Sequence, residues 1–159
     1  MFKRAGLLIV VVLLLVCTGA RAQQQDPFFG TWEQNLAKSK YEPAGRAFQE
    51  LTLKFEGSAE NAWAVTQTGV NGQGKPNHAA YTATLDGSDG PIRGSGDWDT
   101  VAVKKLNANT MIMVNKKEGI TVRMILATVS EDGKTFTEDI VGYDVHLVAF
   151  HNVVVFDKQ

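Results

Sequence analysis

The histidines are the first residues to consider for metal or catalytic chemistry, and the chain has three. His146 and His151 are five residues apart, which puts them on opposite faces of a regular strand, so they cannot share a metal ion there. His78 has no acidic residue or imidazole close to it in the sequence. We therefore predict no metal site from spacing and place each histidine at the surface or at a rim. A metal or haem site assembled through space remains the alternative.

Two glycine-rich loops also carry reactive side chains. The loop 94–99 combines two carboxylates with Trp98, a set that suits a cation or a sugar, although such loops are more often simple turns. The other loop, residues 72–76, is not a phosphate loop. No Ser or Thr follows Lys75, and Pro76 stands where the helix of a phosphate loop would begin. The sequence has no nucleophile elbow and no pair of carboxylates with a placed general acid. We therefore expect no catalytic residues, no cofactor and no enzyme activity.

Arg123 is the candidate for direct contact with a ligand. It lies among the apolar residues of the segment 121–125, and a lone guanidinium that faces a protein interior needs a partner. A ligand carboxylate would serve, because it accepts two parallel hydrogen bonds from a guanidinium. The alternative is that Arg123 points to solvent, or pairs with Glu138 or Asp139 on the next strand.

An export signal precedes these residues. A short basic start is followed by an apolar run, residues 7–16, and by a small-x-small triplet that ends at Ala22. These are the three parts of a secretory signal peptide. We predict cleavage after Ala22, which gives a signal peptide, residues 1–22, and one domain, residues 23–159. The apolar run is shorter than the roughly twenty residues of a membrane-spanning helix, so we expect no stable membrane span after cleavage.

Cys17 offers a second processing route. Bacterial lipoproteins are acylated on a cysteine directly after a similar apolar run, and Leu14 fits that pattern, whereas Val16 stands where a small residue is usual. We expect a periplasmic or secreted protein, with a lipid anchor through Cys17 as the alternative. Cys17 is the sole cysteine, so cleavage after Ala22 leaves a protein without disulfides, thiolate nucleophiles or cysteine-held metals.

The charge balance argues against nucleic acid and anionic membranes as partners. The whole chain has 16 basic and 17 acidic residues, and the signal peptide would remove three basic ones, Lys3, Arg4 and Arg21. The mature protein is then acidic and lacks the basic patch that phosphate-rich partners require. Its length suits one domain with its own core, and we expect a monomer.

Turn residues divide the mature chain into short runs rich in Val, Ile, Thr and aromatic residues, the pattern of an all-β protein. The expected strands are 29–34, 50–56, 61–68, 78–86, a short one at 91–94, 99–106, 110–117, 120–130, 134–141 and 146–156. We predict an antiparallel up-and-down β-barrel of about 8–10 strands, because closure protects the edges of so many strands. A two-sheet β-sandwich is the alternative. The one longer connection, after the first strand, is expected to form a loop or short helix.

Alternation within the strands assigns residues to the interior. Leu51, Leu53 and Phe55 share the apolar face of one strand. Other runs are apolar on both faces, which indicates a covered outer face or a barrel corner. Candidate ligand-binding residues are three methionines, whose thioethers adapt to varied shapes, and two aromatic residues, with ordinary core filling as the alternative. With Arg123, these candidates are Met111, Met113, Met124, Tyr41 and Trp63.

The first strand resembles the start of known barrels. Its Gly30-Thr31-Trp32 is similar to the G-x-W opening of the lipocalin and fatty-acid-binding-protein families, the calycin β-barrels. There the glycine allows close backbone approach and the tryptophan plugs the closed end, so the resemblance implies these structural roles for Gly30 and Trp32. Residues 30–43 also resemble a group of small secreted bacterial lipocalin-like proteins without assigned function.

The end of the chain departs from this pattern. Lipocalins pack an arginine near the end of the last strand over the tryptophan, whereas this chain has no arginine after Arg123, and Lys158 is the residue left to cover Trp32. The resemblance implies an exported barrel that binds a small apolar or amphipathic ligand, with the connection 36–48 near its mouth. The alternative is a solid-core β module that acts by surface contact with an envelope partner.

Overall fold

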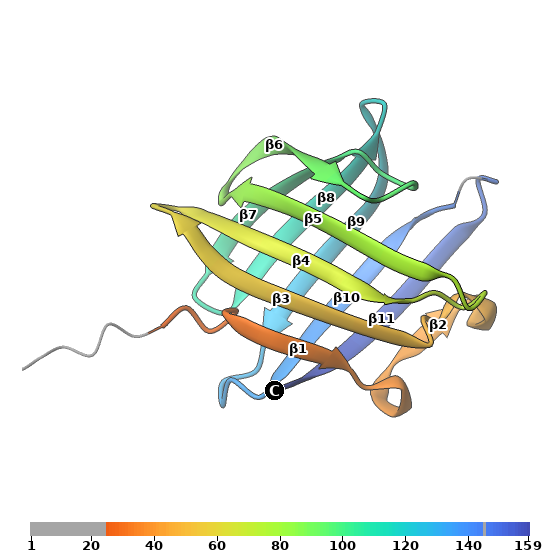
Figure 1. Cartoon of the computed structure of the whole chain (residues 1–159), viewed down its shortest axis with the longest axis horizontal. Coiled ribbons are helices and arrows are strands. Elements are labelled where there is room, and N and C mark those ends of the chain that lie inside the picture. The colour runs from red at the N-terminus through yellow and green to blue at the C-terminus, as the bar shows by residue number, and fades with distance from the viewer. Residues whose placement is uncertain (1–24, 145) are drawn as a thin grey trace, which may run out of the picture.

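A computed structural model describes residues 25–144 and 146–159, in which eleven antiparallel strands form one sheet (Figure 1). The strands are β1 (Gly30–Gln34), β2 (Lys40–Glu42), β3 (Glu50–Ala59), β4 (Ala62–Val70), β5 (Pro76–Thr84), β6 (Asp86–Arg93), β7 (Thr100–Asn107), β8 (Thr110–Lys117), β9 (Ile120–Val129), β10 (Thr135–Tyr143) and β11 (Ala149–Lys158). Two short 3-10 helices, η1 (Leu36–Lys38) and η2 (Ala44–Arg46), flank β2. Within these ranges no helix has the length and apolar character needed to cross a membrane. The predicted signal peptide and Cys17 lie outside the described residues.

The sheet closes on itself. Its strands follow chain order from β3 to β11, and β1 pairs with both β3 and β11. Across this closing seam Trp32 lies opposite Lys158, and Gln34 lies opposite Phe156. Without β2, ten strands make a closed up-and-down barrel. The prediction of a barrel, rather than a two-sheet sandwich, is confirmed.

β2 is a strand that the sequence analysis did not predict. It pairs with residues 151–153 of β11, on the edge of β11 where β1 pairs with residues 156–158. β1 and β2 therefore share this edge, and η1 bridges the break between them. Asn35 fixes η1 in place, because its Oδ1 accepts a hydrogen bond from the Lys38 backbone N–H and its Nδ2 donates to Asp157 at 2.6 Å.

β6 also differs from the prediction. The sequence predicts a turn at residues 86–90 and a short strand at 91–94, whereas the observed strand begins at Asp86 and ends at Arg93. Pro91 lies inside β6, opposite Thr100 of β7. Only two residue pairs join β6 to β5, so the proline stands where little of the hydrogen-bonded ladder forms.

Aromatic side chains fill the end of the barrel where β1 begins, which we call the closed end. Trp32 is 0% exposed, and its Nε1 donates to the Phe28 carbonyl oxygen at 2.8 Å. Its ring centroid lies 5.6 Å from that of Phe136. The aromatic residues buried here are Phe28, Trp32, Phe55, Trp63, Phe136 and Phe156. These packed aromatic rings form the core of the closed end.

The outer wall formed by β9 and β10 is apolar and exposed. The sequence leaves two interpretations of such runs, a covered outer face or a barrel corner. The outer face is not covered here, because Met124, Leu126 and Val141 are 48%, 47% and 49% exposed. Met124 lies opposite Val141. The expectation that Met124 faces the interior is therefore wrong, since side chains alternate along a strand and it is Arg123 that faces inward.

Candidate functional site

Four polar side chains from different strands meet inside the barrel, and we call them the interior polar cluster. They are Tyr81 of β5, Asn115 of β8, Arg123 of β9 and Glu138 of β10. The cluster lies between the closed end and the opposite end, the mouth, which the connections β4–β5, β6–β7, β8–β9 and β10–β11 form. Gln67 of β4 also lines this space and donates to Asn77 Oδ1 at 2.7 Å, and the rest of the lining is apolar or aromatic. Polar groups of the cluster must therefore find partners among these few polar side chains or in a bound molecule.

Arg123 reaches into the interior and makes one direct hydrogen bond. Its Nε donates to Asn115 Oδ1 at 2.8 Å, and the two residues lie opposite each other on β8 and β9. On the other side Arg123 lies opposite Gly142 of β10, where an added Cβ would come within 2.8 Å of the Arg123 Cβ. The glycine thus leaves room for the arginine. Burial lowers the pKa of Arg123, and the charge of Glu138 opposes this.

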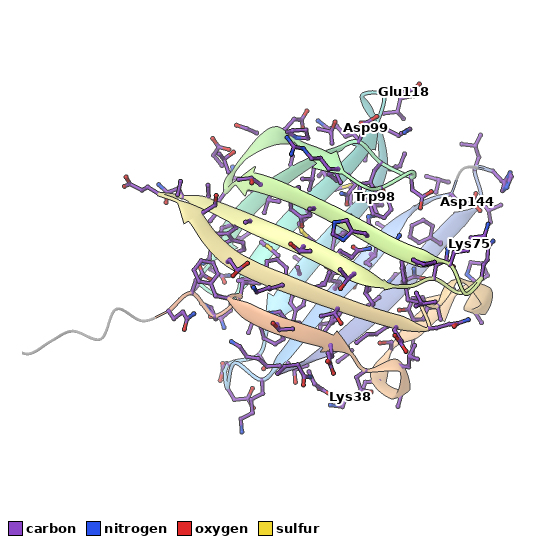
Figure 2. The ribbon with its side chains drawn as sticks, in the orientation of Figure 1. Lys38, Lys75, Trp98, Asp99, Glu118 and Asp144 are labelled. Carbon is purple, nitrogen blue, oxygen red and sulfur yellow. The ribbon has the colours of Figure 1, made fainter. Side chains whose placement is uncertain are left out.

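Trp98 covers the Arg123 guanidinium. Its ring centroid lies 3.7 Å from the guanidinium carbon Cζ, the geometry of a cation–π stack. Trp98 belongs to the β6–β7 connection and is only 8% exposed. Figure 2 shows it at the same end of the barrel as Glu118 and Asp144. The loop in which the sequence suggests a cation or sugar site therefore turns its tryptophan into the mouth.

Glu138 is buried in the same cluster without a direct partner. It is 8% exposed, and the residues opposite it on β9 and β11 are the apolar Ala127 and Val154. Among the described residues, none forms a hydrogen bond or close ion pair with its carboxylate. Burial raises the pKa of Glu138 to about 7, and the Arg123 charge acts in the opposite direction. The two residues interact across the cluster without the direct pairing that one alternative predicts.

Two tyrosines border Glu138. The Tyr81 hydroxyl donates to Met113 Sδ at 3.7 Å, and burial, reinforced by the Glu138 charge, raises the pKa of Tyr81. Tyr41 of β2 accepts a hydrogen bond from the Gln34 side-chain amide, and burial, again with the Glu138 charge, raises the pKa of Tyr41 to about 12. Both phenols therefore stay neutral near neutral pH and act as hydrogen-bonding groups.

A cavity of about 20 Å³ lies within the interior polar cluster. This is room for about one water molecule. Leu53, Phe55, Val65 and Ile125 form the apolar part of its wall, while the cluster itself and Trp98 form much of the rest. A larger molecule would have to displace side chains of the cavity wall, of which Trp98 is the one that comes from a connection between strands.

The other predicted ligand-binding residues are spread over the barrel. Met113 lines the cavity, whereas Met111 is fully buried outside the cavity wall. Trp63 belongs to the closed end, where its ring centroid lies 5.2 Å from that of Phe28. Met124 is on the outer wall. Of these candidates, Met113 lines the cavity with Arg123, and Tyr41 borders Glu138 from β2, whereas Met111, Met124 and Trp63 lie outside the cavity wall.

From the sequence we do not predict Trp98, Asn115 or Glu138 as ligand-binding residues. We do place Trp98 in a loop that suits a cation or a sugar, and we name Glu138 as a possible partner of Arg123. The sequence does contain a signal for Asn115 and Glu138, because each occupies a position on the face of its strand that is otherwise apolar. Glu138 has the same parity as the buried Phe136 and Ile140, and Asn115 the same parity as Met111 and Met113. Trp98 lies within a loop that has no periodic pattern, so alternation gives no such signal for it.

The histidines take no part in the cluster. His78 is exposed on β5, and His146 precedes β11 in an exposed connection, so it is not on the strand face that the spacing argument assumes. His151 points outward from β11, with its Nε2 2.8 Å from Asp139 Oδ1. In the described ranges no three His, Cys, Asp or Glu side chains gather in a way that could hold a metal ion.

The fold is that of the calycin-type β-barrels. The fluorescent protein UnaG superposes with a TM-score of 0.55 at 13% identity, covering 83% of this chain and 97% of UnaG. The zebrafish ileal bile acid-binding protein, in complex with cholic acid, superposes with a TM-score of 0.51 at 14% identity, covering 84% and 99%. The sequence matches no protein-family model and no curated protein. The fold that the G-x-W resemblance implies is confirmed, and at these identities the likeness concerns the fold alone.

Proposed function

We propose that this chain is an exported binding protein that takes a small amphipathic acid into its barrel, with the acidic head group at Arg123. One observation carries the proposal. The guanidinium has five N–H donors, yet a single one, at Nε, has a hydrogen-bond acceptor among the described residues. The remaining donors lie beside a cavity, under the ring of Trp98. A carboxylate is the group that such donors bind best.

The surroundings of Arg123 fit an amphipathic molecule. Beside the polar cluster, the cavity wall contains Leu53, Phe55, Val65 and Ile125, which suit an apolar body. The zebrafish protein of similar fold is complexed with cholic acid, which is itself an amphipathic acid. Entry requires the loop 94–99 to swing outward, since the closed cavity holds about one water molecule.

Dodecanoate is a suitable first probe. Titration of the full mature chain, followed by tryptophan emission, should show saturable binding with a change from the displaced Trp98. Arg123→Gln should weaken dodecanoate binding about 10- to 100-fold, the value of a charge-assisted pair, and should leave the binding of dodecanol unchanged. Arg93→Gln, at an exposed arginine of β6, is the matched control. Equal affinity of Arg123→Gln and the wild type would place the head group elsewhere.

A second candidate function rests on the outer wall. The exposed Met124, Val141 and Tyr143 border an open groove of about 290 Å³ at the mouth side of β9–β11, and the interior cavity is small. These features suit a module that docks an envelope partner through its surface. A photo-crosslinking residue at Val141 should then capture one defined partner in the producing cells, while the same residue at the exposed Thr128 should not. If dodecanoate fails to bind, this candidate replaces the first.

Export is part of the proposal and has its own test. Mass spectrometry of the mature protein should find an N-terminus at Gln23, in its free or cyclised form. An acylated N-terminus at Cys17 would instead place the barrel on a membrane surface through a lipid anchor. An intact Met1 would contradict export by this signal.

A further inference from the structure

We propose that Glu138 takes up one proton when an acidic head group binds at Arg123, so that the site accepts an anion and a proton together. This inference rests on the proposed function and specifies the chemistry of its site. Glu138 becomes a specificity-determining residue, which donates a hydrogen bond to the ligand when it is protonated and repels the ligand when it is ionised.

The geometry makes the two residues act on the same ligand atoms. Arg123 and Glu138 both line a cavity with room for about one water molecule. A carboxylate or sulfonate that reaches Arg123 through this space therefore lies beside Glu138 as well. Two anions that share so small a cavity cannot both remain charged without a large energetic cost. A neutral carboxyl group, in contrast, supplies an O–H donor to the bound anion.

Among the titratable groups around the bound head group, Glu138 is the one that can take up a proton near neutral pH. Its neighbours on β9 and β11 are apolar, so no donor from them stabilises the ionised carboxylate. The titratable groups that face it are Arg123 of β9, Tyr81 of β5 and Tyr41 of β2. The arginine stays charged and the tyrosines stay neutral near neutral pH. Asp97, in the loop that carries Trp98, acts on Arg123 and is itself exposed.

The proton balance is simple. The proton comes from solvent and ends on a Glu138 carboxyl oxygen, and no covalent bond of the ligand changes. The pKa of Glu138 in the empty barrel is about 7, and a bound anion raises it further. At pH 8 most empty molecules are ionised, so binding takes up close to one proton; at pH 5 it takes up almost none. Above pH 7 the dissociation constant should rise about tenfold per pH unit.

Dodecane-1-sulfonate is the probe that separates protein from ligand titration, because its charge is constant from pH 5 to 9. Calorimetric titrations below its micelle concentration, in two buffers of different ionisation enthalpy, count the protons taken up. We expect about one proton per ligand at pH 8. Glu138→Gln keeps the shape and a hydrogen-bond donor, and should bind equally well at pH 5 and pH 9. Asp139→Asn, which removes the outward carboxylate next in the chain, should retain the wild-type pH dependence.

The outcomes separate this inference from the proposed function. If the wild type binds the sulfonate with the same affinity from pH 5 to 9 and takes up no proton, the inference is overturned while the binding function stands. If neither dodecanoate nor the sulfonate binds at any pH, the binding function itself fails and the inference with it. The proton count uses the wild-type protein alone, so it decides the matter even if Glu138→Gln folds poorly.

Discussion

The ammonium group of Lys158 lies 4.8 Å from the centroid of the Trp32 ring. The same Nζ donates to the Pro27 carbonyl oxygen at 3.3 Å, so the last residue of β11 joins the first strand and the segment before it. Gly30 makes this approach feasible: its φ is +127°, and an added Cβ would meet the Lys158 side chain at 3.1 Å. A lysine thus closes the barrel below its tryptophan.

The closed end should supply much of the stability. Trp32 is fully buried and packs against Phe136, so Trp32→Ala should lower the free energy of unfolding by about 3–5 kcal/mol. Urea unfolding followed by circular dichroism measures this change. Leu126→Ala, on the exposed wall, is the control and should cost less than about 1 kcal/mol. Similar losses in the two variants would mean that Trp32 does not anchor the core.

Removal of the Trp98 ring should open the mouth. In Trp98→Ala the guanidinium of Arg123 loses its cover, so dodecanoate should associate and dissociate faster than with the wild type. Stopped-flow fluorescence can follow this, because Trp32 and Trp63 remain as reporters. Trp98→Phe retains a ring over Arg123 and should behave like the wild type. Unchanged rates in Trp98→Ala would show that ligand enters by another route.

Stability should fall as pH rises through neutrality. The pKa of Glu138 in the folded chain, about 7, exceeds its ordinary value of 4.5. Folding therefore favours the protonated form, and this contribution is full below about pH 4.5 and is lost as pH rises through 7. The loss should reach up to about 3 kcal/mol, whereas Glu138→Gln should lack it.

Unfolding free energies at pH 5 and pH 8 test this point for both proteins. Hydrogen bonds from Asn35 and Lys38 lower the pKa of Asp157. Asp157 therefore has the opposite pH dependence, because the stability that it contributes is lost at acid pH. This contribution is common to both proteins and cancels in their difference. If the difference between wild type and Glu138→Gln is the same at both pH values, Glu138 titrates normally in the folded barrel.

Gly142 should be intolerant of even one methyl group. A Cβ at this position would lie 2.4 Å from the Val122 carbonyl oxygen and 2.8 Å from the Arg123 Cβ. Gly142→Ala should therefore destabilise the barrel by about 1–3 kcal/mol and displace Arg123, which weakens dodecanoate binding. Gly45→Ala, whose Cβ would meet nothing within 4 Å, is the matched control and should change neither stability nor affinity measurably.

Much of the barrel follows from the sequence because its signals are local. Leu51, Leu53 and Phe55 alternate with exposed or half-exposed residues and are buried, as the period of two predicts. Gly119 and Gly133 have positive φ in the β8–β9 and β9–β10 hairpins, a conformation that glycine adopts readily. β2 escaped prediction because three residues carry no usable periodicity, and its pairing with β11 depends on a contact more than a hundred residues away.

The candidate site was less predictable for a related reason. Arg123 stands out in an apolar segment, but the residues that define its surroundings come from separate strands. The cover provided by Trp98 depends on how a glycine-rich loop folds back, which no periodic pattern encodes. The isolation of Glu138 depends on which residues β9 and β11 set opposite it, and this is known only once the register is fixed.

The division of one barrel edge between β1 and β2 has a mechanical consequence. β1 has five residues and β2 has three, and each holds its own stretch of β11. The two pairings are independent: β2 can separate from residues 151–153 near the mouth while β1 stays paired with residues 156–158 beside Trp32. Loss of the β2–β11 pairs would therefore leave the β1–β11 closure of the barrel in place.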